Sequence, residues 1–127
     1  MADHPNAAMV RKSLEGFNTS NMQDMSEWLD DNVVWHEIGR AEPIRGKAAL
    51  GERMAGATSD YTIEGKLHDV VGNDDHTIAL IEATATRGDK KFTYKVAEIY
   101  HIKNGKLIER WAFSDDTAAI NDFFGGA

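Results

Sequence analysis

The sequence predicts one α+β domain, in which three N-terminal helices pack on a strongly bent antiparallel sheet and enclose a pocket. Three observations favour this class. Apolar residues recur at helical spacing in the first half of the chain, whereas they alternate with the period of a β-strand in the second half. The pair Asn104-Gly105 is a strong signal for a two-residue turn between two such strands. A length of 127 residues suffices for one core but not for two, so residues 1–127 are expected to form a single domain.

The first half of the chain carries the three predicted helices and one short strand. The strand is rich in β-branched and aromatic residues, and Pro43 in the segment after it cannot occupy a central ladder position. Gly46 can cap the third helix. The expected elements are a frayed start at 1–5, helices at 6–17 and 22–30, a strand at 33–38, a loop at 39–45 and a helix at 46–57.

The second half is expected to form a meander of antiparallel strands. Glycine, asparagine and aspartate separate the alternating segments, and these residues favour turns. A last short helix can follow Asp115. The expected strands are 61–71, 76–87 and the two arms of a hairpin at 92–115, with turns at 72–75 and 87–91 and the helix ending at 124.

The hairpin places an acid on an apolar face. If Asn104 and Gly105 form its loop, the register is fixed, and Glu98 faces Trp111 in the middle of an aromatic and aliphatic surface. A buried carboxylate must be paired, protonated or exposed to a cavity, because an unpaired buried charge is very costly. Glu98 is therefore the leading candidate for function. The other residues predicted on this face are Tyr94, Val96, Tyr100, Ile102, Leu107, Glu109, Phe113 and Asp115.

Composition and motifs exclude several classes of function. The formal net charge of −7 argues against a nucleic-acid-binding surface. The absence of cysteine excludes disulfides and thiolate metal sites, and no apolar run approaches the roughly 20 residues of a membrane span. The sequence at 36–40 is not the zinc-binding HExxH pattern, and no nucleotide fingerprint is present. No metal, cofactor or membrane partner is expected, and the N-terminus lacks a signal peptide, so a cytoplasmic location is expected.

The order of elements and three local motifs resemble one superfamily. Leu29–His36 resembles the lead into its first strand, and Gly39–Leu50 resembles the ketosteroid isomerase segment "G-x-E-P-x-x-G-x-A-A-I" with one extra residue. Asn104–Trp111, followed by Asp115-Asp116, resembles the end of SnoaL-like proteins. The chain is therefore similar to nuclear transport factor 2, ketosteroid isomerase and the SnoaL-like polyketide cyclases. The resemblance implies the cone-shaped NTF2-like (cystatin-like) fold.

The resemblance also implies catalytic residues. His36 occupies the position of the isomerase's general base, and Glu98 falls at or near the acid that donates a hydrogen bond to the developing oxyanion; that isomerase acid is a known example of a carboxyl group kept protonated by an apolar site. Asp115 matches the trailing aspartate of the cyclases. The first-helix stretch Arg11–Leu14 contains no tyrosine, although the isomerase uses one there. Substrate contacts are expected from Tyr94, Val96, Tyr100, Trp111 and Phe113.

Each catalytic candidate also has a structural interpretation. Glu98 could be a carboxylate hydrogen-bonded to Trp111 or to a tyrosine, and His36 could be a satisfied core histidine. Asp115 precedes the last helix and could cap it.

Two functions of different class follow, and a third ranks last. The first is a cofactor-independent acid/base enzyme, an isomerase, cyclase or dehydratase that acts on a small hydrophobic carbonyl compound. The second is a non-catalytic ligand-binding or scaffold domain. The third, hydrolysis of an epoxide by activated water, needs an Asp-Arg-Asp cluster, and the register above puts Arg110 on the opposite face.

A homodimer is also expected, because two surfaces of small apolar residues favour a partner. The predicted surfaces consist of Thr77, Ala79, Ile81, Ala83 and Ala85, and of Ala97 and Ile99 beside Ala112.

Overall fold

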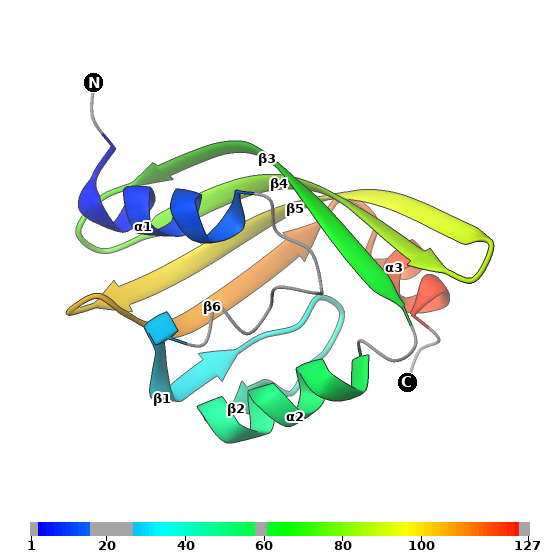
Figure 1. The fold of residues 1–127 in the computed structure, drawn as a ribbon, viewed down its shortest axis with the longest axis horizontal. Helices are drawn as coiled ribbons and strands as arrows, with labels where there is room; N and C mark the ends of the chain where they lie inside the picture. Colours follow the sequence, from blue (N-terminus) through cyan, green and yellow to red (C-terminus); the bar gives the residue numbers. More distant parts are fainter. Residues whose placement is uncertain (1–2, 16–26, 58–60, 125–127) are drawn as a thin grey trace.

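The computed structural model describes residues 3–15, 27–57 and 61–124, which form three helices and one six-stranded sheet (Figure 1). The strand order across the sheet is β2-β1-β6-β5-β4-β3. The elements are α1 (Pro5–Leu14), β1 (Leu29–Trp35), β2 (Ile44–Arg45), α2 (Lys47–Ala57), β3 (Thr62–Gly72), β4 (Thr77–Arg87), β5 (Lys90–Lys103), β6 (Lys106–Ser114) and α3 (Thr117–Phe123).

The predicted meander is confirmed, but the predicted helices and the purely antiparallel sheet are partly wrong. Within the described residues a single helix, α1, precedes the first strand, and α2 follows β2. The helix expected at 22–30 lies mostly outside the described residues, and Leu29 and Asp30 already belong to β1. The sheet is mixed, because β1 runs parallel to β6 with Trp35 beside Arg110. This pairing joins segments far apart in the sequence, so no local pattern could have indicated it.

The hairpin of β5 and β6 contains a β-bulge that changes which side chains share a face. Asn104 and Gly105 both have positive φ, 52° and 75°, as the predicted turn requires. Ile102 pairs with Leu107 as predicted, but His101 then pairs with Glu109, so Ile108 has no partner of its own. Every residue of β6 after Ile108 therefore lies on the face opposite to the predicted one.

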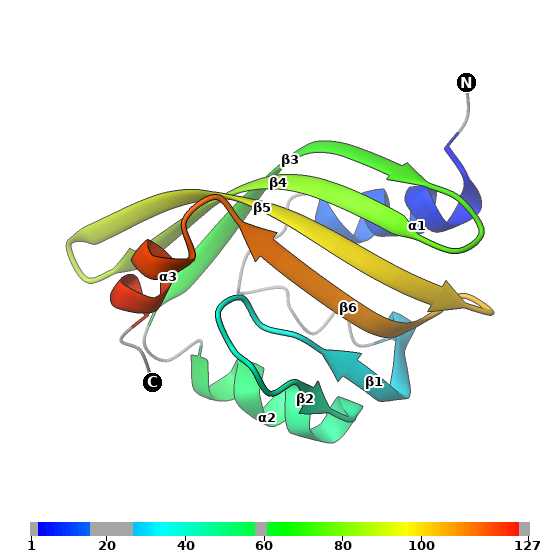
Figure 2. The same cartoon turned by 180° about the vertical axis from the view of Figure 1, so that it is seen from behind.

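The inner face of the sheet, defined here as the face that packs on α1 and α3, carries two apolar clusters. Figure 1 looks onto the side with α1, and Figure 2 shows β3 to β6 in front of that helix. Residues of α1 pack with β3 to β6 in one cluster, and Ile120 of α3 packs in the other. The first cluster includes Val10, Leu14, Val70, Ala79, Tyr100 and Leu107, and the second includes Ala83, Ala85, Tyr94, Val96, Ala112 and Ile120.

The first predicted dimer surface is wrong. Thr77, Ala79, Ala83 and Ala85 are buried on the inner face, where the helices cover them. Ala112 is buried as well, because the bulge turns it inward, away from the outer face that carries its predicted neighbours.

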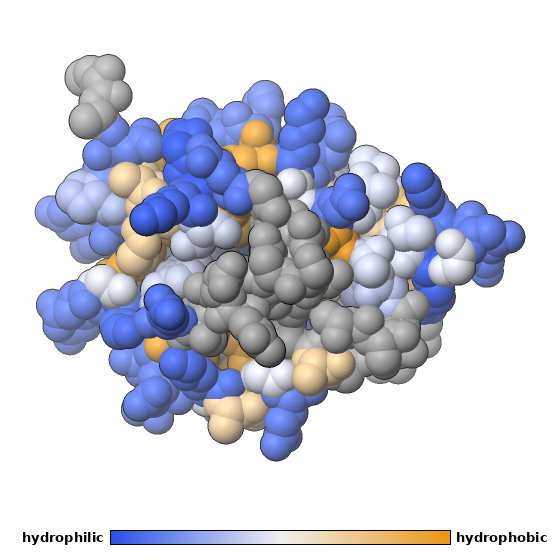
Figure 3. All heavy atoms as spheres, in the orientation of Figure 1, coloured by the Kyte–Doolittle hydropathy of each residue, from blue (hydrophilic) through white to orange (hydrophobic). Residues whose placement is uncertain are grey.

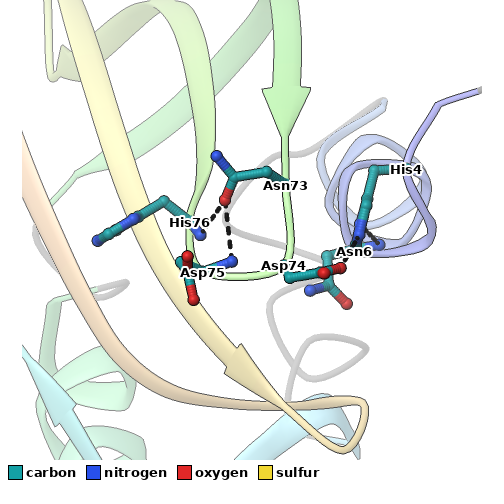
Figure 4. A network of polar contacts seen from close by, with 6 residues as sticks. All are labelled: His4, Asn6, Asn73, Asp74, Asp75 and His76. Carbon is teal, nitrogen blue, oxygen red and sulfur yellow. Dashed lines mark hydrogen bonds and ion pairs between the residues drawn. The ribbon is translucent and has the colours of Figure 1, made fainter.

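The start of α1 is tied to the turn between β3 and β4 (Figure 4). The ring of His4 accepts a hydrogen bond at Nδ1 from the backbone N–H of Asn6, and its Nε2 lies 2.7 Å from Asp74 Oδ1. His4 therefore caps α1, and Pro5 begins it, within the stretch that was expected to be frayed. Asn73 Oδ1 accepts from the N–H groups of Asp75 and His76, which closes the predicted turn.

On the side that carries α1 and α2, hydrophilic residues cover both ends of the molecule (Figure 3). Hydrophobic residues emerge there only as small separate patches. None of the helices in the described part of the chain combines the length and the apolar character needed to cross a membrane.

Candidate active site

The bulge at Ile108 divides the predicted site residues between the two faces of the sheet. Tyr94, Val96, Glu98 and Tyr100 of β5 lie on the inner face, as predicted. Beyond the bulge, Arg110 and Ala112 of β6 lie on the inner face and pair with Tyr100 and Glu98. Trp111 and Phe113 lie on the outer face, so the predicted pairing of Glu98 with Trp111 is wrong.

Glu98 and Arg110 form a buried ion pair on the inner face. Arg110 Nη2 donates to Glu98 Oε1 at 2.7 Å, and the hydroxyl of Tyr100 donates to Glu98 Oε2. Arg110 Nη1 donates to the carbonyl oxygen of His36 at 3.0 Å, and its guanidinium lies 4.2 Å from the centre of the Trp35 ring. Both oxygens of Glu98 accept hydrogen bonds, as expected of a charged carboxylate, whereas the predicted oxyanion-binding role requires a protonated acid.

The position of Glu98 favours contact with a ligand. On β5 it lies between Val96 and Tyr100, which belong to the two different apolar clusters. Its cross-strand neighbours on either side, Ala79 and Ala112, have the smallest side chain that a strand position can carry apart from glycine. The side chain of Glu98 keeps 15% of its surface exposed, whereas Arg110 keeps 9% and Tyr100 is fully buried. Glu98 is therefore the most exposed member of this cluster.

Burial and the charge of Glu98 set the protonation of the neighbouring groups. Burial raises the pKa of Tyr94 to about 12, with a further contribution from the negative charge of Glu98. The same two causes raise the pKa of Tyr100 well above its ordinary range. Burial alone would lower the pKa of Arg110, but the charge of Glu98 acts in the opposite direction and the net pKa is raised. Both tyrosines therefore keep their protons at neutral pH, and Arg110 keeps its charge.

We expect Tyr94 to make the protein less stable at alkaline pH. Below pH 10 this tyrosine is protonated in the folded and the unfolded chain and contributes no pH dependence. Between its unfolded pKa of 10.0 and its folded pKa of about 12, the unfolded chain releases the proton first, so the free energy of unfolding falls by roughly 2 kcal/mol. Urea unfolding at pH 9 and pH 12 measures this loss. The loss should be smaller by that amount in Tyr94→Phe, and equal losses in the two proteins would contradict the assignment.

His36 lies on the other side of the sheet from Glu98, and the predicted pairing of these two residues in one chamber is wrong. Its ring is stacked on Trp111 with the ring centres 5.4 Å apart, and its Nε2 lies 2.8 Å from Glu109 Oε2. Only its backbone belongs to the inner cluster, through the hydrogen bond from Arg110. The side chain alternates outward because its strand neighbour Trp35 points inward onto Arg110.

His36, Trp111 and Phe113 line a pocket, which we call the edge pocket. It has a volume of about 280 Å³ and is lined by residues 36–41, residues 111–113 and Thr117. Three of the predicted site residues thus meet in one pocket, and Glu98 does not line it.

Asp115 belongs neither to the cluster around Glu98 nor to the edge pocket. Its side chain is exposed and accepts a hydrogen bond from the backbone N–H of Lys95 at 3.0 Å. The cap of α3 is Asp116, whose Oδ1 accepts from the N–H of Ala119, so the cap lies one residue later than expected. Asp115 therefore holds the end of the β5–β6 pair.

Arg110 is the site residue that the sequence reasoning missed. One signal was present, because Leu107 and Ile108 are adjacent apolar residues that break the alternation of β6, and such a break indicates a bulge. A bulged register also places an arginine, Arg110, on the same face of the sheet as Glu98. Within the described ranges, no three histidine, aspartate or glutamate side chains are grouped so that they could hold a metal ion.

Comparison with known proteins agrees with this fold. Residues 10–110 match the family described as SnoaL-like domain. No protein of curated function matches the chain. The structure of Bal32a, from a soil-derived mobile gene cassette, is 28% identical with a TM-score of 0.79, and the match covers 94% of this chain and 95% of that one.

Two more distant solved structures share the fold. A protein with a cystatin-like fold from Xanthomonas campestris is 17% identical over 92% of this chain and 95% of its own, with a TM-score of 0.78. An LEH-like epoxide hydrolase from M. tuberculosis is 16% identical over 96% of this chain and 91% of its own, with a TM-score of 0.71. Because residues 10–110 make up most of the 127-residue chain, the protein belongs to the family of SnoaL-like domains.

Proposed function

We propose that this SnoaL-like domain is a cofactor-independent acid/base enzyme that acts on a small hydrophobic carbonyl compound, with Glu98 as the proton acceptor. The observation that carries the proposal is the ion pair of Glu98 and Arg110 on an apolar inner face. An unpaired acid there would be too costly to keep charged, and Arg110 and Tyr100 hold the carboxylate in its charged form. A catalytic role for Glu98 would explain why a charged side chain is kept at a position on the inner face that an apolar residue could fill.

Glu98 would remove a proton from the carbon next to the carbonyl group. The electrons of that C–H bond move onto the carbonyl oxygen and form an enolate, which a hydrogen-bond donor must stabilise. Tyr94 lies four residues from Glu98 on the same face, about 13 Å along the strand at about 3.3 Å per residue, and its phenol stays protonated. The enolate oxygen is only two bonds from the carbon that loses the proton, so it lies close to Glu98. Tyr94 would instead bind a second polar group at the far end of a substrate that spans this distance. Return of the proton to another carbon gives isomerisation, and attack of the enolate on a second carbonyl gives cyclisation.

The experiment is the exchange of α-hydrogens in small cyclic ketones and enones, followed by ¹H NMR in D₂O. A catalysed exchange that follows protein concentration supports the proposal, because removal of the α-proton is the first step of every reaction in this class. Binding of these compounds without any exchange would contradict it and favour the non-catalytic ligand-binding alternative.

Epoxide hydrolysis is the second candidate, and one observation favours it. Arg110 faces inward, which removes the reason for ranking this reaction last. Arg110 is paired with Glu98, and the charge of Glu37 contributes to the raised pKa of Arg110. The guanidinium therefore has one carboxylate partner and a second carboxylate nearby. In this reaction Glu98 would take the proton from a water molecule that attacks the epoxide carbon. The ring C–O bond would break, and the alkoxide oxygen released would take up a proton. Opening of small aliphatic epoxides in the absence of ketone exchange would select this candidate.

We also propose that the chain forms a homodimer through the outer face of the sheet, by a surface that keeps Ala97 and Ile99 of the second expected surface. Val71 and Leu80 are 55% and 41% exposed, and they extend an apolar patch across three strands. The patch consists of Val71, Ile78, Leu80, Ala97 and Ile99.

Leu80→Glu is expected to convert a dimer into a monomer, because a charge in the middle of the patch would have to be buried. Thr84→Glu, which lies on the same strand and face outside the patch, serves as the control. Light scattering of both variants and the parent at micromolar concentration measures the change. A parent protein that is already monomeric would contradict the proposal.

A further inference from the structure

The edge pocket lies where the pairing of β1 with β6 ends. The pairing of β1 with β6 ends at Trp35 and Arg110, and the backbone N–H of His36 makes one more hydrogen bond to the carbonyl of Arg110. Beyond this point the loop 37–41 leaves β6, and the pocket lies between the loop and residues 111–113. Gly39 allows the loop to approach α3 closely. Its φ is +77°, which favours glycine, and a Cβ at this position would lie only 2.5 Å from Asn121 Oδ1.

The walls of the pocket are aromatic and well supported. Phe113 is 58% exposed, the most exposed of the large hydrophobic residues in the described part of the chain. Trp111 is held in place by two histidines, His36 stacked on it within 5° of parallel and His101 edge-on with the ring centres 4.7 Å apart. Rings held in this way offer contact area at little cost in side-chain entropy.

The charged groups around the pocket leave one cation without a counterion. Glu37 is held by Arg53 of α2 at 3.2 Å, and Glu109 is held by His36. Arg40 lines the pocket, and no carboxylate in ranges 3–15, 27–57 and 61–124 pairs with it. In a chain whose formal net charge is −7, this guanidinium is a local site of positive charge.

We propose that the edge pocket is a second ligand site, distinct from Glu98, and that it binds a small planar aromatic carboxylate. The ring of the ligand would lie against Trp111 and Phe113. Its carboxylate would accept two parallel hydrogen bonds from Arg40, the geometry that guanidinium and carboxylate groups favour. A volume of about 280 Å³ is just below the range of about 300–1,000 Å³ usual for ligand pockets, so it suits a molecule with a single ring.

The test is an NMR titration of the ¹⁵N-labelled protein with benzoate. The indole N–H signal of Trp111 should shift, and the dissociation constant should rise about tenfold or more in Arg40→Gln, because a hydrogen bond to a charged group is lost. Benzamide has the same shape without the charge and should bind about tenfold more weakly than benzoate. Arg40 is exposed, so its substitution should leave the fold intact.

Two controls make the result specific. Arg45→Gln, which removes an exposed arginine from β2, should leave benzoate binding unchanged. Glu98→Gln should also leave it unchanged, because Glu98 does not line the edge pocket. Equal affinity for benzamide and benzoate, or unchanged affinity in Arg40→Gln, would overturn the proposal. A shift at Tyr94 in place of Trp111 would overturn it as well, since the ligand would then occupy the inner face.

Discussion

Arg110→Met is expected to lower the free energy of unfolding by about 3–5 kcal/mol, the usual cost of removing one partner from a buried ion pair. Methionine fills much of the space of the arginine stem and keeps its contact with Trp35, so the loss is mainly electrostatic. Glu98 would remain on the apolar face with only the hydroxyl of Tyr100 as a partner. Urea unfolding followed by tryptophan fluorescence measures the change.

A double variant separates the cost of an unpaired charge from the value of the ion pair. When Glu98→Leu is combined with Arg110→Met, most of the lost stability should return, because apolar residues replace a buried ion pair at little net cost. The control is Arg53→Gln, which breaks the more exposed pair with Glu37 and should cost less than about 1 kcal/mol. A loss in Arg110→Met no larger than in this control would show that Glu98 does not depend on Arg110.

Local patterns were sufficient to predict the strands and turns of the second half of the chain. The Asn104-Gly105 turn has the backbone geometry that those two residues favour, and the first hairpin pair, Ile102 with Leu107, follows directly from it. The alternation of apolar residues also placed Glu98 on the inner face, as its burial shows. These features depend on residues close together in the sequence.

The site as a whole could not be predicted, because one bulge and one long-range pairing determine it. An extra residue in β6 costs little locally but exchanges the two faces, so Arg110 turns inward and Trp111 outward. The parallel pairing of β1 with β6 then sets the direction of His36, which lies 74 residues from Arg110 in the sequence. The family resemblance implied the fold and the position of Glu98, but the register places the side chain of His36 on the other face of the sheet.

The inner cluster gives Glu98 a role different from that of its isomerase counterpart. A carboxylate that accepts from Arg110 and Tyr100 is an acceptor of protons, whereas a protonated acid would donate to the enolate oxygen. Tyr94 keeps its proton at neutral pH because its pKa is raised, but it lies four residues along the strand and would contact a more distant polar group of the substrate.

Glu98→Gln is therefore expected to lower kcat/KM at least 100-fold for any ketone or epoxide that the protein turns over, the contribution typical of a positioned general base. Glutamine keeps the size of the side chain and can still accept from Arg110, so the cluster retains its shape while the base is removed. The decisive measurement compares Glu98→Gln with Glu82→Gln, an exposed acid on the outer face of β4, which should turn over substrate at the parental rate. Equal rates in both variants would rule out Glu98 as the base. Loss of rate together with loss of the cooperative urea transition would instead assign Glu98 to stability. In that case Glu98→Asp, which restores the carboxylate, should recover the fold and turnover together.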